Sequence, residues 1–134
     1  MEAACDMAAM ALENGTDVIV ATPHCNSPRG GDNFRSPRVD ELLLRLRERL
    51  DYYGLPVQLL PGAEIQLKGD MTPLLRRDRV YTLNGSRYLL VEFFFDERAE
   101  EMSRQLQGVF RAGFVPVVAH PERYGAVQIG RAHV

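Results

Sequence analysis

Four side chains that can bind a metal or transfer a proton each follow a predicted apolar strand. They are His24, Glu64, Glu92 and His120, and they are separated by 40, 28 and 28 residues. One strand–helix unit of a (β/α) barrel averages about 31 residues, and the active site of such a barrel is built where its strands end. The spacing therefore predicts that the four side chains converge at one rim of a parallel sheet.

The residue types at these positions favour a hydrolytic metal site. Alone, a histidine or glutamate at a strand end is more often a hydrogen-bonded structural residue. Glu92 is the most informative, because it follows an apolar strand and precedes three phenylalanines. In such surroundings an unpaired carboxylate is costly and a metal-paired one is not. Carboxylates and imidazoles without thiolates favour a Mn, Fe or Zn site that activates water over a structural zinc site.

Two arginines are candidates for binding an anion at this rim. Arg123 lies three residues after His120, close enough for its guanidinium to hold an anion beside a metal. A surface ion pair with Glu122 explains Arg123 equally well. Arg29, in the polar stretch from residue 26 to residue 38, is the weaker candidate.

Neither cysteine fits a thiol-based phosphatase mechanism. The active-site loop of such an enzyme needs a cysteine, five residues and then an arginine. Gly31 and Ala11 stand where Cys25 and Cys5 would need that arginine. Two cysteines outside any CxxC pair are expected to be reduced thiols.

The elements that position these residues alternate between helix and strand. Apolar residues recur at helical spacing over residues 4–12, 39–50 and 99–110, and Thr72-Pro73 predicts a short helix to residue 77 with Thr72 as its N-cap. Apolar runs predict strands at residues 18–21, 57–60, 88–91 and 115–119. Asn84-Gly85 is a turn that allows a hairpin between residues 80–83 and 87–94. The rhythm predicts an α/β fold with a parallel sheet covered by helices, either an open doubly wound sheet or a closed barrel.

Composition and charge exclude several kinds of partner. The 134 residues carry 16 basic and 18 acidic side chains, for a net charge of −2, which suits one globular domain with no basic face for nucleic acid. No apolar run reaches the roughly 20 residues of a membrane span. Glu2 and Asp6 stand where a secretory signal carries positive charge. We therefore expect a cytoplasmic protein with no nucleic-acid partner and no membrane insertion.

Four short motifs resemble the polymerase-and-histidinol-phosphatase (PHP) superfamily. They are ATPH (residues 21–24), PGAEI (61–65), YLLVEF (88–93) and VAHPERY (118–124). They are most similar to the manganese-dependent protein tyrosine phosphatases associated with capsular and exopolysaccharide biosynthesis. The resemblance implies a distorted (β/α)7 barrel, here incomplete, with parallel strands and outer helices. It also implies up to three divalent metal ions, expected to be Mn, with Fe or Zn as alternatives.

The resemblance further implies a role for each candidate residue. Glu64 would bridge two metals, Glu92 and His120 would bind the second, His24 would bind the third, and Arg123 would hold the phosphate. The implied reaction is hydrolysis of phosphotyrosine on a protein, and the implied partner is a cognate bacterial tyrosine kinase of polysaccharide assembly. Two other functions stay open, namely a small-molecule phosphoesterase such as a histidinol phosphatase, and a non-catalytic α/β binding module.

The motifs that are missing shape the expected domain organisation. Residues 1–128 are expected to form part of a PHP-type phosphatase domain, because the family's His-x-His with its following Asp, and its Asp-x-His, have no counterpart here. Activity is accordingly expected of a longer parent protein and not of these 134 residues alone. Residues 129–134 continue no upstream pattern and match the translation of a common sequencing adapter, so we expect them to be a non-native tail.

Overall fold

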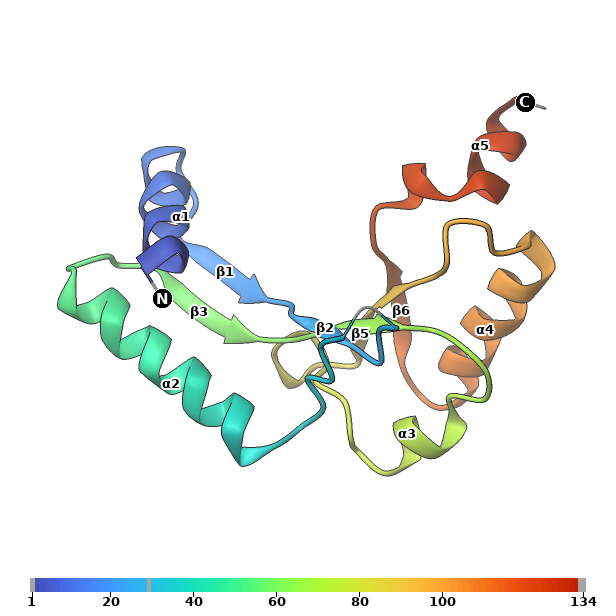
Figure 1. The fold of residues 1–134 in the computed structure, drawn as a ribbon, viewed down its shortest axis with the longest axis horizontal. Coiled ribbons are helices and arrows are strands. Elements are labelled where there is room, and N and C mark those ends of the chain that lie inside the picture. The colour runs from blue at the N-terminus through green and yellow to red at the C-terminus, as the bar shows by residue number, and fades with distance from the viewer. Residues whose placement is uncertain (1, 29, 133–134) are drawn as a thin grey trace.

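Helices and parallel strands alternate along the chain (Figure 1). The structure is a computed structural model that describes residues 2–28 and 30–132, with only the backbone for residues 129–132. The elements are α1 (Glu2–Glu13), β1 (Val18–Ala21), β2 (His24–Cys25), α2 (Pro37–Tyr52), β3 (Gln58–Pro61), β4 (Glu64–Gln66), α3 (Thr72–Arg76), η1 (Leu83–Gly85), β5 (Tyr88–Glu92), α4 (Ala99–Arg111), β6 (Val115–Val118), η2 (Pro121–Arg123) and α5 (Gly125–Ala132).

Two strands of the sheet are interrupted: β1 resumes as β2, and β3 resumes as β4, in each case after two residues. β1 pairs with β3 and β2 pairs with β4, both in parallel, and both pairs set each residue opposite the residue 40 positions later. The two-stranded sheet β1-β3 therefore leads directly into the four-stranded sheet β2-β4-β5-β6, whose strands are also parallel. The expected α/β fold with a parallel sheet is confirmed.

The interruption between β3 and β4 includes Gly62, a position where the packing requires glycine. A Cβ atom on Gly62 would lie 2.9 Å from Val20 Cγ1 and 3.1 Å from the carbonyl oxygen of Ala21. Because contacts this short force neighbouring atoms to move, the chain can pass this close to β1 only with glycine here. The close approach holds the start of β4 beside the start of β2.

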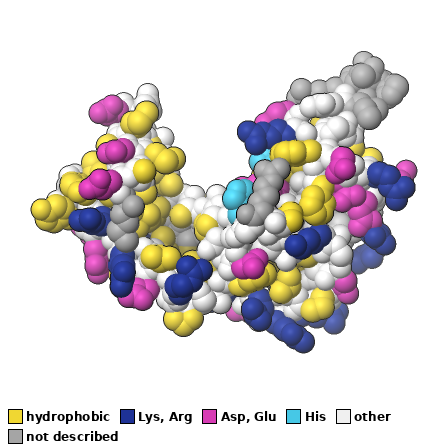
Figure 2. Space-filling view, viewed as in Figure 1, with side chains coloured by type: hydrophobic (Ala, Val, Ile, Leu, Met, Phe, Trp, Pro, Cys, Tyr) yellow, Lys and Arg dark blue, Asp and Glu magenta, His cyan; other side chains and the backbone are white. Residues whose placement is uncertain are grey.

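Two hydrophobic clusters stabilise the elements. The larger cluster has the buried residues Cys25, Ala63, Ile65, Leu67, Met71, Leu75, Val80, Tyr81, Leu89, Val91, Phe93, Met102, Val109 and Tyr124. The smaller cluster has the buried residues Cys5, Ala8, Leu50 and Leu59, and it joins α1 and α2 to β3. In Figure 1 the elements of the smaller cluster form the left arm, and α3, α4 and α5 lie in the right arm. Figure 2 shows a hollow between the arms, with histidine side chains on its right wall.

The predicted helices are confirmed, but two local predictions are wrong. Residues 80–83 form no strand, because both edges of β5 are already paired in parallel, with β4 and with β6, and so no edge is left for a hairpin. Thr72 is the first residue of α3 and not its N-cap, and its N–H donates to Asp70 Oδ1 at 3.0 Å instead.

Two further observations concern the helix at the end of the chain and the hydropathy of the helices. The backbone of α5 continues to Ala132, through most of the segment expected to be a non-native tail, whose origin stays a prediction. Within the part of the chain that the structure describes, no helix has the length and apolar character needed to cross a membrane.

Candidate metal centre

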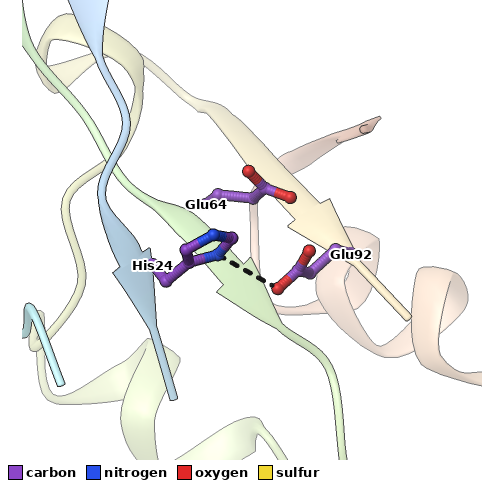
Figure 3. Close-up of side chains that lie close together, drawn as sticks. All are labelled: His24, Glu64 and Glu92. Carbon is purple, nitrogen blue, oxygen red and sulfur yellow. Dashed lines mark ion pairs between the residues drawn. The ribbon is translucent and has the colours of Figure 1, made fainter. Parts of the chain in front are cut away.

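Strand register places the first three candidate side chains on one face of the sheet. His24 lies directly opposite Glu64 in the pairing of β2 with β4, and Glu92 lies opposite Gln66 in the pairing of β4 with β5. Paired residues of parallel strands point to the same face, as do residues two apart on one strand. Figure 3 accordingly shows His24, Glu64 and Glu92 pointing toward one another from three neighbouring strands.

Short distances join the four candidates into one cluster. His24 Nδ1 lies 3.4 Å from Glu92 Oε1, and a set of ligand atoms from His24, Glu64 and Glu92 lies within 4.8 Å of one another. His120 Nε2 lies 2.9 Å from Glu64 Oε1 and 3.3 Å from Glu92 Oε2. The structure thus brings together all four residues that the strand-end pattern selected.

His120 enters the cluster through an unusual backbone conformation. It follows β6 with φ 35° and ψ 58°, a left-handed conformation that is rare for residues other than glycine. Its ring packs 5.5 Å from the ring of Tyr124, which is fully buried, and 6.1 Å from the ring of Phe95. Strained residues of this kind are held by their surroundings and often lie at functional sites. The turn directs Nε2 at both carboxylates.

The two carboxylates have opposite pKa shifts because they lie side by side. For Glu92, burial is the largest effect, and the hydrogen bond and negative charge of Glu64 add to it, so the pKa is raised. For Glu64, burial also acts upward, but hydrogen bonds with Glu92 and His120 outweigh it and lower the pKa. Two carboxyl groups this close resist ionising together unless positive charge compensates them.

Gln66 is a member of the site that the sequence analysis missed. Its neighbours assign the orientation of its buried side-chain amide: Nε2 then donates to Glu92 Oε1 at 3.1 Å, and the amide oxygen accepts the Phe94 N–H at 3.2 Å. Asn26 Nδ2 donates to the Gln66 carbonyl oxygen at 3.0 Å. A signal was present in the sequence, since Gln66 lies two residues after Glu64 and so shares its face of the strand.

Three further residues were considered in the sequence analysis, namely Arg123, Arg29 and Cys25. Arg123 is exposed on η2, and its backbone N–H donates to the His120 carbonyl oxygen at 3.0 Å. Arg29 lies outside the described residues. Cys25 is fully buried, and burial raises the pKa of its thiol to about 12, in agreement with the exclusion of a cysteine nucleophile.

The donor set suits a hard or borderline divalent cation. Imidazole nitrogens and carboxylate oxygens are the ligands that Mn, Fe and Zn take in hydrolytic sites. A cation between Glu64 and Glu92 would supply the positive charge that two adjacent carboxylates need. Gln66 provides the kind of hydrogen bond that orients a ligating carboxylate. The residues present therefore fit a metal ion.

These features define an α/β protein with a candidate metal centre on one face of a parallel sheet. Comparison with known proteins then identifies its family. The chain belongs to the CpsB/CapC family of capsular polysaccharide synthesis, whose family model matches residues 1–134.

Named relatives of this family are tyrosine phosphatases. The tyrosine-protein phosphatase YwqE of Bacillus subtilis is 36% identical over 121 residues, which cover 88% of this chain and 46% of YwqE. The tyrosine-protein phosphatase CpsB of Streptococcus pneumoniae is 31% identical over 122 residues, covering 90% of this chain and 49% of CpsB. The chain thus spans about half the length of these curated relatives. The resemblance to capsule-associated tyrosine phosphatases is confirmed.

A solved structure supports the same relationship. It comes from crystal structures of YwqE from Bacillus subtilis and CpsB from Streptococcus pneumoniae, described as unique metal-dependent tyrosine phosphatases. It matches with a TM-score of 0.82 and 32% identity, covering 93% of this chain and 50% of the solved chain.

Proposed function

We propose that this chain supplies part of a metal-dependent phosphatase that hydrolyses phosphotyrosine on a protein. The observation that carries the proposal is the convergence of His24 on β2, Glu64 on β4, Glu92 on β5 and His120 after β6, with ligand atoms a few ångströms apart. The relatives YwqE and CpsB, both named tyrosine-protein phosphatases, favour a tyrosine phosphatase over a histidinol phosphatase. The donor set weighs against a non-catalytic binding module.

The side chains of the site would hold the metal and orient the substrate. A bound divalent cation would lower the pKa of water and offset the negative charge of a phosphoryl group. We propose manganese as the cation, with Glu64 positioned to serve two ions. Gln66 keeps Glu92 in a fixed orientation through its amide. Arg123, exposed three residues after His120, would bind phosphoryl oxygens through its guanidinium fork.

The relatives support proposals on the architecture and the substrate of the protein. We propose that the parallel strands belong to a distorted (β/α)7 barrel, supported by the TM-score of 0.82 to a metal-dependent tyrosine phosphatase. The substrate would be a tyrosine kinase of polysaccharide assembly, supported by the family's description as capsular polysaccharide synthesis. We propose the cytoplasm as the location of this protein.

Replacing Glu64 tests the proposal directly. In the full-length protein that contains these residues, Glu64→Ala should remove bound metal and abolish hydrolysis of a phosphotyrosine peptide. The matched control is Glu41→Ala, since Glu41 forms an exposed ion pair with Arg45 on α2. Metal content by mass spectrometry and phosphate release are the two measurements. Full metal occupancy with unchanged turnover in Glu64→Ala, or faster hydrolysis of histidinol phosphate than of the peptide, would contradict the proposal.

A further inference from the structure

Three consecutive phenylalanines after Glu92 lie in different surroundings. Phe93 is buried in the larger cluster, where its ring packs 5.6 Å from the ring of Tyr124. Phe94 and Phe95, in contrast, are 37% and 44% exposed. The chain therefore presents two adjacent aromatic side chains to solvent directly beside a buried carboxylate of the candidate metal centre.

Both exposed rings line the same cavity as the metal-centre residues. The cavity has a volume of about 70 Å³, and its walls include His24, Glu92, Phe94 and Phe95. Pro28 contributes a further apolar wall. The cavity is thus lined both by the candidate metal ligands His24 and Glu92 and by apolar aromatic and proline side chains.

The two phenylalanines are held in place by their backbone. The Phe94 N–H donates to the amide oxygen of Gln66 at 3.2 Å. The carbonyl oxygen of Phe95 accepts the Gly125 N–H at 3.0 Å. The Phe95 ring also meets the His120 ring edge to face. Because one segment supplies Glu92, Phe94 and Phe95, the rings keep a fixed position relative to the metal centre.

We propose that Phe94 and Phe95 bind the phenyl ring of phosphotyrosine while its phosphoryl group lies at the metal centre. The inference rests on the proposed function and names the residues that select an aryl phosphate. Aromatic rings attract one another in edge-to-face and offset arrangements beyond the effect of buried area. Phosphoserine and phosphothreonine carry no ring to contact these two side chains, so Phe94 and Phe95 favour phosphotyrosine over them.

Kinetic constants of variants in the full-length protein test the assignment. Phe94→Ala and Phe95→Ala should each raise the KM for a phosphotyrosine peptide about tenfold. The inhibition constant of inorganic phosphate, which has no ring, should stay within about twofold of wild type. Phe94→Tyr and Phe95→Tyr, which keep the ring, should restore the wild-type KM. Phe110→Ala is the matched control, since Phe110 is 67% exposed on α4 and does not line the cavity.

The outcomes separate this inference from the proposed function. If wild type hydrolyses no phosphotyrosine, the proposed function fails and the inference fails with it. If wild type is active and the alanine variants keep its KM, only the ring assignment is overturned. If the phosphate inhibition constant changes in parallel with the KM, the phenylalanines act through the metal centre and the ring assignment is again overturned.

Discussion

The side chains of the candidate metal centre depend on a second layer of hydrogen bonds. Glu92 is buried and contacts His24 and His120, and its Oε1 also accepts the Gln66 amide. The backbone carbonyl oxygen of Gln66 in turn accepts a hydrogen bond from Asn26 Nδ2. A ligating carboxylate that can rotate loses affinity for its metal, so the amide of Gln66 contributes to metal binding without touching the ion.

Gln66→Leu should weaken metal binding without unfolding the protein. Leucine matches the size of glutamine but cannot donate to Glu92 Oε1, and loss of such a hydrogen bond costs about 10- to 100-fold in metal affinity. Isothermal titration of the metal-free full-length protein with Mn²⁺ measures the change. Gln107→Leu is the control, because Gln107 is exposed on α4 and its Nε2 donates to the Ser103 hydroxyl, on the same helix, at 3.4 Å. Equal affinities in the two variants would contradict the role of Gln66.

Cys25 is expected to be chemically inert despite its position next to His24. Its thiol is fully buried, and burial raises its pKa to about 12, so the reactive thiolate is scarce at pH 8. Cys25→Ser should therefore keep phosphatase activity within a few-fold of wild type, and the folded protein should resist a thiol-reactive dye at pH 8. Complete loss of activity in a folded, metal-replete Cys25→Ser variant would indicate a thiol nucleophile.

At the scale of single residues, the sequence predicts the candidate metal ligands better than it predicts the residues and turns that position them. His24, Glu64, Glu92 and His120 were accessible because each follows a strand, and parallel strands end at one edge of a sheet. Gln66 escapes the sequence analysis because the predicted strand ends at residue 60, and without a strand at Glu64–Gln66 the face that Gln66 shares with Glu64 is not apparent. The left-handed turn at His120 was equally hidden, since its neighbours Ala119 and Pro121 do not require it.

Among the elements, the interrupted strands bring the site together. β1 and β3 share their register with β2 and β4, so the two breaks leave His24 opposite Glu64. β2 has only two residues, which is too short for any hydrophobic pattern to reveal. The hairpin prediction failed for a related reason, since turn chemistry at Asn84-Gly85 is local whereas the partners of β5 come from distant segments.

Gly62→Ala should destabilise the fold and disturb the metal centre. The added Cβ would meet Val20 Cγ1 at 2.9 Å and the Ala21 carbonyl oxygen at 3.1 Å, and overpacking of this kind costs about 1–3 kcal/mol. Relief of the contact requires β3 and β4 to move, which displaces Glu64 two residues later. Urea denaturation gives the loss of unfolding free energy, and Mn²⁺ titration gives the loss of affinity.

A second glycine provides the control for this substitution. Gly108 lies inside α4, and a Cβ there would meet no atom within 4 Å. Gly108→Ala should therefore stabilise the protein by about 0.5–1 kcal/mol through helix propensity and leave metal affinity unchanged. Destabilisation by both substitutions would mean that the close approach at Gly62 is not the cause.

For the whole molecule, burial is divided unequally between the two arms. Among the described residues, fourteen buried side chains form the larger cluster and four form the smaller one. The strands that carry Glu64 and Glu92 contribute buried residues to the larger cluster, whereas β1 and β3 contribute Ile19, Ala21 and Leu59 to the smaller one. The candidate metal centre is thus built mainly on the better-packed part of the chain.

This unequal burial predicts that the 134-residue chain unfolds in two stages, with the arm that holds the smaller cluster unfolding first. Fully burying one apolar side chain stabilises by about 1.5–3 kcal/mol, so the arm with the smaller cluster has far less stabilisation to lose. Segments with few buried contacts open at lower free energy and exchange their amide hydrogens sooner. Hydrogen exchange measured by mass spectrometry should show peptides from β1 and β3 exchanging at least about tenfold faster than peptides from β4 and β5. Exchange at one common rate across all four strands would show instead that both clusters unfold as a single cooperative unit.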